Sequence, residues 1–188
     1  MNNIIAITIG DINGIGIKIL LNSWKNKEIN NFILFSNIEI IKKYLAKNKL
    51  KLKLNKINKN SSSLNFSEKR INIFSFNAKS LEDNTYKSLK YAYKFCNNKT
   101  CIGMITLPLR KDRIINKIDK KFIGHTEFFQ KIEKKENVNM ILYHKKIIIS
   151  PLTTHVEVNK ISKIIRNKKF LFNQIYNINN TLKVDFNI

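Results

Sequence analysis

The chain has 188 residues, 43% of them hydrophobic, which is enough for one domain with a substantial core. Its 35 lysines and arginines against 13 aspartates and glutamates give a net charge of +22. Such a charge is typical of proteins that bind polyanions, but here Lys, Asn and Ile are in excess in predicted strands, helices and loops alike. Because the charge is spread along the chain, it indicates a compositional bias. Nucleic acid is therefore the least favoured partner class.

The cysteines and the apolar runs indicate a soluble protein of a reducing compartment. Cys96 and Cys101 are too few for a disulfide framework and lack the spacing of a metal site. The chain begins directly with a strand pattern and shows no signal peptide. No apolar run approaches the ~20 residues that a transmembrane helix needs. We expect a cytoplasmic protein with no membrane partner.

The first elements predict the opening of a doubly wound α/β unit. Residues 4–9 form a nearly continuous apolar run typical of a buried strand, and residues 17–24 predict a helix. The predicted core side of this helix consists of Ile19, Leu20 and Trp24. Between them, residues 10–16 form a glycine loop whose free N–H groups at the helix start attract anions. The spacing is G-x-x-x-G-x-G rather than the G-x-G-x-x-G of nucleotide-binding proteins, so a tight turn without a ligand is an equal alternative.

The remaining elements continue the alternation. Further strands are predicted at residues 32–35, 71–76, 101–106, 138–143 and 146–150, with an edge strand at 51–58 and His144 in a hairpin turn. Helices are predicted at residues 38–45, 80–96 and 159–176, and another begins near Thr126. The helix at 159–176 would face the core with its isoleucines, Leu171 and Phe172. The order is broadly β-α-β-α-β-β-α-β-α-β-β-α, which predicts an α/β sheet sandwiched by helices.

Two short polar islands lie at the ends of apolar segments, where α/β sheets usually place their chemistry. His125 and Thr126 stand near a predicted helix start, where a backbone N–H, a hydroxyl and an imidazole can converge on a phosphate or hydroxyl. His155 follows a strand and can bind a metal ion or exchange a proton. The alternatives are that Thr126 caps the helix and that His155 is a capping or packing residue. A metal site needs three or four ligands, and the sequence shows no cluster with metal-binding spacing.

Four sequence blocks resemble those of the 4-hydroxythreonine-4-phosphate dehydrogenase family. Residues 8–16 are similar to its opening T-x-G-[DE]-P-A-G-I-G, and residues 106–111 are similar to its T-[AG]-P-x-x-K segment. Residues 124–128 match its G-H-T-E-[FY] block without change, and residues 152–156 are similar to its T-T-H-[IVL] block. The blocks occur in the family's order and at about its spacing. Each block alone is a weak signal, and jointly they are specific.

The resemblance implies an α/β/α sandwich of the isocitrate/isopropylmalate-dehydrogenase-like type. It implies NAD-dependent oxidation of 4-phosphohydroxy-L-threonine, with loss of the carboxyl group as CO2, on the route to pyridoxal phosphate. Members are homodimers in which a divalent metal ion (zinc, magnesium or cobalt) holds the substrate. On this pattern His125 and Thr126 bind the phosphorylated substrate, and His155 is one of three histidine metal ligands. The catalytic and cofactor-binding residues stay unassigned.

The chain also departs from the family pattern. Ile12 and Ile17 stand where two prolines are expected, and Lys18 replaces an acidic residue. The chain ends before the family's N-P-H-A-G-E and Y-H-D-Q-G blocks, which carry the other two metal histidines. We therefore expect residues 1–188 to form an incomplete α/β dehydrogenase-like region: most of one domain plus the start of the connection to the second.

These observations support two main functional hypotheses. The first is a truncated or split dehydrogenase that is inactive alone and works as a homodimer or with a missing C-terminal polypeptide, since one histidine cannot hold a catalytic ion with useful affinity. The second is a degenerate, non-catalytic remnant that keeps the fold as an interaction protein. A basic nucleic-acid-binding domain is a third possibility, motivated only by charge. If the dehydrogenase hypothesis holds, the imidazoles of His125 and His155 converge on one pocket, which contains only part of the residues that the family uses.

Overall fold

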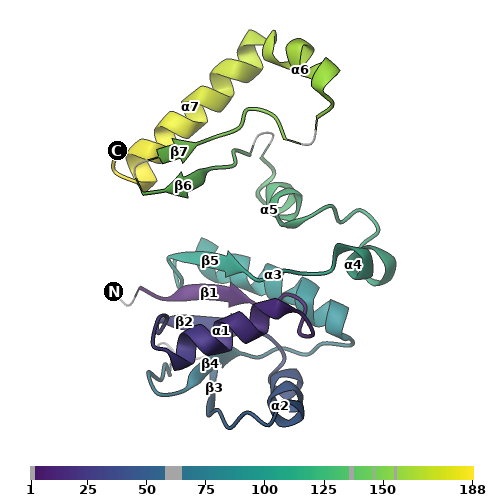
Figure 1. The fold of residues 1–188 in the computed structure, drawn as a ribbon, viewed down its shortest axis with the longest axis vertical. Helices are drawn as coiled ribbons and strands as arrows, with labels where there is room; N and C mark the ends of the chain where they lie inside the picture. Colours follow the sequence, from purple (N-terminus) through teal and green to yellow (C-terminus); the bar gives the residue numbers. More distant parts are fainter. Residues whose placement is uncertain (1–2, 58–64, 136–137, 146, 155) are drawn as a thin grey trace. The chain divides into compact units, whose positions relative to one another are not determined.

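The structure is a computed structural model that describes residues 3–57, 65–135, 138–145, 147–154 and 156–188. The chain divides into two compact units, one ending at Phe128 and the other beginning at Phe129 (Figure 1). Within the described ranges, no helix combines the length and apolar character needed to cross a bilayer.

The first unit is built on a five-stranded parallel sheet with the strand order β3-β4-β2-β1-β5 (Figure 1). The strands are β1 (Ile5–Thr8), β2 (Phe32–Phe35), β3 (Leu54–Ile57), β4 (Ile71–Phe74) and β5 (Gly103–Thr106). The helices are α1 (Ile15–Lys25), α2 (Ile38–Lys47), α3 (Leu81–Asn97) and α4 (Lys111–Lys117), and α5 (His125–Glu133) crosses the division between the units. The predicted edge position of the third strand is confirmed, because β3 pairs only with β4 in the described sheet.

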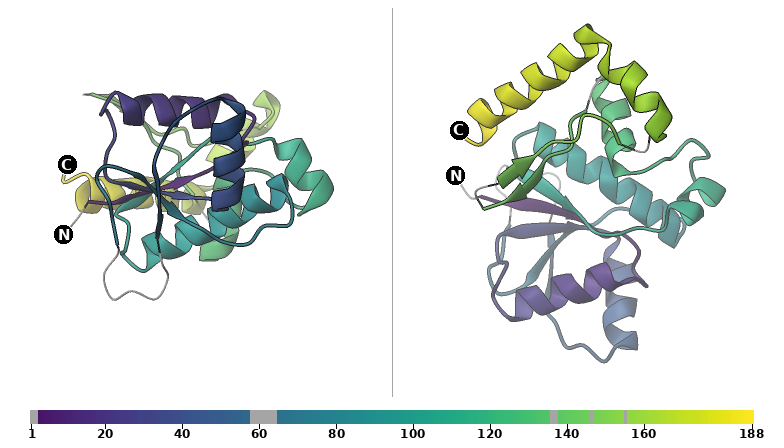
Figure 2. Two further views of the ribbon diagram at one scale, coloured as in Figure 1. Left: turned by 90° about the horizontal axis from the view of Figure 1, so that it is seen from below. Right: turned by 45° about the horizontal axis from the view of Figure 1, so that its top comes forward.

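The sheet buries apolar side chains on both faces, and α1 and α3 lie on opposite faces (Figure 2). Ile7 of β1 packs with the α1 residues Ile17 and Leu20 in one core cluster. Its neighbour Ala6 points to the opposite face and packs with Ala92 of α3 in a second cluster. Because successive strand residues alternate between faces, continuous apolar strands supply both cores at once. This arrangement confirms the predicted α/β sheet sandwiched by helices.

Two predictions for the first unit were wrong. Ile19 was expected in the core, but its side chain is 55% exposed, and Leu21 is buried in its place. Helix α4 was missed altogether. It has only seven residues, its N-cap Arg110 makes no side-chain capping hydrogen bond, and Ile114 is its single buried residue. So short a helix leaves no readable apolar periodicity in the sequence.

The second unit contains a β-hairpin and two helices. Strands β6 (Leu142–His144) and β7 (Ile147–Ile149) pair antiparallel, with His144 opposite Ile147. The predicted hairpin is therefore confirmed, but the placement of His144 in its turn was wrong, because His144 is the last residue of the first strand and pairs with Ile147. The helices are α6 (Val158–Ile165) and α7 (Lys168–Asp185).

The single helix predicted at residues 159–176 was wrong in both its continuity and its end. The helix is interrupted at Asn167, whose side-chain oxygen accepts a hydrogen bond of 3.1 Å from the Phe170 N–H and so caps α7. Beyond Tyr176, the polar segment that suggested a helix end continues α7 to Asp185. Asn is unfavourable inside a helix by only a fraction of a kcal/mol, roughly 0.7 at most, so the polar run does not end it.

The second unit has almost no core of its own. Gln174 is its one buried residue among those that the structure describes, and the Asn139 amide donates to the Gln174 side-chain oxygen. The expected core residues Ile165, Phe172 and Ile175 are 43%, 67% and 55% exposed. Such a set of exposed apolar side chains is typical of a surface that another protein segment covers.

Two phenylalanine substitutions measure this difference between the units. We expect Phe74→Ala, at a side chain that is 3% exposed, to lower the free energy of unfolding by about 3 kcal/mol or more. We expect Phe172→Ala to change it by less than about 0.5 kcal/mol, because its side chain is already in water. Urea denaturation measures both. Equal losses would show that Phe172 is buried in solution.

Candidate functional site

The loops that follow β1 and β5 meet at the carboxyl edge of the sheet. The Asp11 N–H donates a hydrogen bond of 2.8 Å to the Pro108 carbonyl oxygen. Gly10, just before it, has a φ of +59°, and a Cβ at this position would lie 2.4 Å from the same carbonyl oxygen. Only glycine fits both the backbone conformation and the space. Neighbouring strand ends in parallel sheets usually form the ligand site, so this junction defines the candidate site.

The glycine loop itself has a structural explanation. The Gly14 N–H donates to the Asp11 carbonyl oxygen at 2.9 Å, and the Asn13 N–H donates to Asp11 Oδ1 at 3.0 Å. A Cβ at Gly16 would lie 3.0 Å from Leu107 Cβ, so this glycine lets α1 approach the β5 loop. These contacts account for the loop as a tight βα turn.

Helix α3 attaches to the same edge through buried polar side chains that sequence reasoning missed. The Thr85 hydroxyl donates to the Gly10 carbonyl oxygen at 2.6 Å, and Asn84 Oδ1 accepts from the Asn37 N–H at 2.7 Å. The buried polar residues on this helix are Glu82, Asn84, Thr85 and Ser88. Of these, Thr85 holds the loop after β1 and Asn84 holds the loop after β2. The only sequence signal was the polar run at the predicted start of the helix.

Thr8, at the carboxyl end of β1, is fully buried, and its Oγ1 has no hydrogen-bond partner among the described residues. It pairs in register with Thr106 of β5 and lies on the face of the sheet that α3 covers, as Ala6 does. A buried hydroxyl without a hydrogen-bond partner costs about 1–3 kcal/mol of stability. Thr8 therefore places an unpaired polar group at the end of β1, just before the glycine loop. Thr8 is also the first residue of the block that resembles the dehydrogenase family.

His125 is the first residue of α5, and its Nε2 is buried without a hydrogen-bond partner among the described residues. Burial lowers the pKa of His125, and the nearby Lys111 ammonium lowers it further, while Glu127 opposes the shift. The imidazole is therefore neutral at neutral pH, because its usual pKa of about 6.5 already lies below 7. A neutral, unpaired imidazole nitrogen is free to bind a ligand oxygen.

The side chains of Lys111 and Glu127 both approach Gly124. A Cβ at Gly124 would lie 3.2 Å from Lys111 Nζ and 2.9 Å from Glu127 Oε2. Gly124 thus leaves open the small space between the ammonium and the carboxylate, next to His125. Sequence reasoning gave Lys111 no weight of its own, because it is one of 35 basic residues.

The three predicted site residues have different outcomes. His125 begins α5 and follows Gly124, whose Cβ position lies 3.2 Å from Lys111 Nζ. Thr126 is exposed one residue into α5, so it does not cap a helix that begins at His125. His155 lies outside the described residues, and its convergence with His125 stays a prediction. Among the described residues, no group of three or more His, Cys, Asp or Glu side chains could hold a metal ion.

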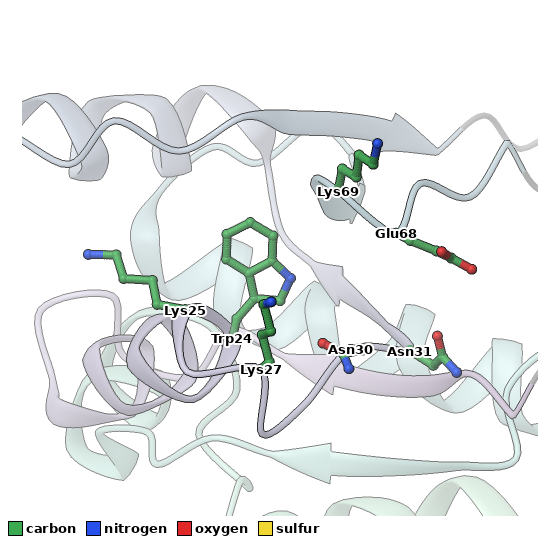
Figure 3. A pocket seen from close by; sticks show the side chains of 7 residues that line it. All are labelled: Trp24, Lys25, Lys27, Asn30, Asn31, Glu68 and Lys69. Atoms are coloured by element: carbon green, nitrogen blue, oxygen red, sulfur yellow. The ribbon is translucent and has the colours of Figure 1, made fainter.

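A larger hollow of about 680 Å³ lies at the opposite edge of the sheet (Figure 3). Trp24 lines it from the end of α1, and Asn31, which precedes β2, accepts a hydrogen bond from the Ile5 N–H at the start of β1. Its other lining residues are Lys25, Lys27, Asn30, Glu68 and Lys69. None of the four family-like blocks contributes to it. The carboxyl end of α1 also presents the negative end of the helix dipole, which disfavours anions.

An ion pair fixes α4 beside the site. Lys117 Nζ lies 2.9 Å from Glu82 Oε1, and this hydrogen bond is the largest cause that lowers the pKa of Glu82. Asp11 and Arg110 line a cavity of about 10 Å³ next to Glu82, which is room for about one water molecule. The cavity is too small for a substrate.

Two glycine substitutions separate the fold from the site. We expect Gly10→Ala to lower the free energy of unfolding by roughly 2 kcal/mol or more. The alanine would strain the left-handed backbone, and its Cβ would clash with the carbonyl oxygens of Leu107 and Pro108. We expect Gly124→Ala to cost less than about 1 kcal/mol, because its Cβ meets only the ends of flexible side chains. Chemical denaturation measures both, and a reversed order would contradict the geometry.

The Glu82–Lys117 pair predicts a dependence of stability on pH. The folded-state pKa of Glu82 is lowered, so its contribution is complete above the unfolded pKa of about 4.3 and is lost as pH falls through the folded value. We expect Glu82→Gln to lose less stability than the unmodified chain between about pH 5 and pH 3. Identical losses, measured by urea denaturation at each pH, would show that the pair does not form.

Together, the parallel sheet, its helices on both faces and the polar carboxyl edge define an α/β protein of the doubly wound class, with its candidate ligand site at that edge. Residues 28–188 match the family described as "Pyridoxal phosphate biosynthetic protein PdxA". The chain belongs to this family, and the resemblance found in the sequence blocks is confirmed.

Individual relatives agree with the family match. The chain is 27% identical over 177 residues to 4-hydroxythreonine-4-phosphate dehydrogenase of Helicobacter pylori, with 89% of this chain and 55% of that protein covered. It is 30% identical over 196 residues to the Wigglesworthia glossinidia brevipalpis enzyme, with 95% and 59% covered. The chain thus spans little more than half the length of the curated relatives that it matches.

Solved structures confirm the fold. A putative 4-hydroxythreonine-4-phosphate dehydrogenase from Salmonella typhimurium superposes with a TM-score of 0.82 at 20% sequence identity, covering 97% of this chain and 60% of that one. The enzyme from Klebsiella pneumoniae gives a TM-score of 0.81 at 19% identity, with 97% and 59% covered. The predicted α/β/α sandwich of the dehydrogenase type is therefore confirmed.

Proposed function

We propose that the chain takes part in the NAD-dependent oxidation, with decarboxylation, of 4-phosphohydroxy-L-threonine in pyridoxal phosphate biosynthesis. Family membership over residues 28–188 supports this reaction class. The observation that carries the proposal is the placement of His125. Its Nε2 is buried without a hydrogen-bond partner among the described residues, next to Gly124 and Lys111, in the family's G-H-T-E-[FY] block that is retained without change.

In this proposal the described residues bind and orient the substrate. His125 Nε2 bonds to a substrate oxygen, and the exposed Thr126 hydroxyl provides a second polar group one residue further along α5. The described residues do not by themselves furnish a site for a divalent metal ion. We therefore assign them no step that involves the metal or NAD. His155 is proposed as one ligand of a zinc, magnesium or cobalt ion.

A second polypeptide segment completes the site in this proposal, either in a homodimer or in a C-terminal polypeptide of the same enzyme. The chain matches only 52–59% of its relatives' length. Exposed apolar side chains provide surfaces for such a segment: Ile105 on the edge strand β5 is 43% exposed, and Phe172 of α7 is 67% exposed. We place this assembly in the cytoplasm.

The alternative is a protein that keeps the fold without the activity. The departures from the family pattern bear on this choice. Ile12 and Ile17, which replace two prolines, are 6% and 0% exposed and pack in the core, while Lys18 is exposed on α1. These substitutions therefore alter packing and surface and leave the His125 site untouched. This observation favours the enzyme over the remnant.

An NAD-reduction assay with 4-phosphohydroxy-L-threonine tests the proposal. We expect no NADH from the chain alone, and NADH when the polypeptide encoded downstream of it is added together with a divalent metal ion. His125→Ala should lower kcat/KM by roughly 10–100-fold, the value of a hydrogen bond to a charged group, and Thr126→Val by about 3–10-fold.

His144→Ala is the matched control, because His144 is exposed in the hairpin of the second unit. It should leave the rate unchanged. Absence of NADH in every combination would contradict the enzyme and support the non-catalytic alternative.

A further inference from the structure

We propose that Lys111 and Gly124 belong to the same subsite as His125, and that the Lys111 ammonium binds an anionic oxygen of the ligand, a carboxylate or phosphate oxygen. This inference rests on the proposed function, which it deepens by assigning a group that recognises the charged part of the substrate. Lys111 is also the lysine of the block at residues 106–111, but sequence reasoning assigned it no role.

The backbone on both sides of the subsite is fixed. Lys111 begins α4, three residues after Pro108, whose carbonyl oxygen is held by the Asp11 N–H at 2.8 Å. Gly124 directly precedes α5, and its carbonyl oxygen accepts a hydrogen bond of 3.1 Å from the Phe128 N–H. Lys111 and His125 therefore lie at the starts of α4 and α5, and both residues belong to the first unit.

The geometry leaves a small polar space between these groups. The position of a Cβ on Gly124 is 3.2 Å from Lys111 Nζ and 2.9 Å from Glu127 Oε2, so an atom there would be in contact with both. A ligand oxygen near the Lys111 ammonium would be attracted to it. The Glu127 carboxylate would repel an anion and so restrict where the charge of the ligand can lie.

Lys111 is not committed to a structural ion pair. Other lysines of the first unit are, such as Lys117 with Glu82 at 2.9 Å and Lys87 with Asp83 at 2.9 Å. None of the salt bridges between described residues involves Lys111, and its side chain is exposed. An exposed lysine that lies beside Gly124 and has no salt-bridge partner among the described residues is suited to binding a ligand anion.

The neutral state of His125 makes the pair complementary to one anionic oxygen. Lys111 supplies the positive charge, and a neutral imidazole supplies one N–H donor or one acceptor nitrogen. The charged groups that face His125 are Lys111 and Glu127, and the lowering of its pKa by burial and by Lys111 agrees with this arrangement. An anionic oxygen would gain from both groups without requiring a proton to move.

Binding to the full chain tests this assignment without any turnover. The ring signals of His125, identified with His125→Asn, are followed by NMR during titration with inorganic phosphate, with acetate and with 4-phosphohydroxy-L-threonine. We expect a saturable shift with the phosphorylated substrate. Competition by phosphate would assign the Lys111 contact to the phosphate group, and competition by acetate would assign it to the carboxylate.

Lys111→Met should weaken substrate binding by about 10-fold or more, the value of one hydrogen bond to a charged group. The matched control is Lys120→Met, which removes the same charge from an exposed residue just beyond α4 and should change binding less than about two-fold. Gly124→Ala should weaken binding as Lys111→Met does, because its Cβ fills the space beside Nζ, while it lowers the free energy of unfolding by less than about 1 kcal/mol.

Equal effects of Lys111→Met and Lys120→Met would overturn the assignment, since they would show only a response to the net charge. Absence of a saturable shift with all three probes would also overturn it. The two proposals fail separately. NADH production that Lys111→Met leaves unchanged would remove this subsite and keep the enzyme, while Lys111-dependent binding without NADH in any combination would keep the subsite and remove the enzyme.

Discussion

The close approach of the β1 and β5 loops at Gly10 is the constraint on which the rest of the site depends. The left-handed backbone of Gly10 brings the Asp11 N–H onto the Pro108 carbonyl, and Thr85 of α3 closes the same turn with a hydrogen bond to the Gly10 carbonyl. One end of α3, the start of α1 and the segment leading to α4 thus meet at one point. Lys111 lies three residues after Pro108, so the contact between the two loops fixes where α4 and Lys111 begin.

Two different kinds of packing support this edge. The middle of the sheet is held by apolar clusters on both faces, which are insensitive to exact geometry as long as volume is kept. The carboxyl edge is held by directional hydrogen bonds from Asn84 and Thr85, which tolerate little displacement. A site that must hold a substrate to within fractions of an ångström benefits from the second kind of support.

The sequence predicted the elements that local residue patterns determine. It did not predict the features that depend on contacts between distant parts of the chain. The apolar run of β1 and the glycines after it were readable, because a buried strand and a tight turn each require particular residue types. The polar face of α3 was not, because buried Asn84 and Thr85 contradict the apolar pattern that marks a helix face. The break at Asn167 depends on one side-chain cap, which Asn provides as readily in a loop.

The same division holds for the candidate site. His125 was found because it lies in a polar island at the end of an apolar segment and because its block matches the family without change. Lys111 ends another of the blocks but received no role among so many lysines, and only the structure places its Nζ beside Gly124. His155 was predicted from its block alone, and the described residues neither include it nor supply further metal ligands.

The central claim is that this carboxyl edge is one part of a shared pocket whose metal side includes His155. A crystal structure of the chain, bound to the segment that completes it and to 4-phosphohydroxy-L-threonine, tests this claim most directly. The account predicts that the rings of His125 and His155 line the same cavity, with the ligand between them. A structure in which His155 faces another part of the molecule, away from the ligand, would contradict it.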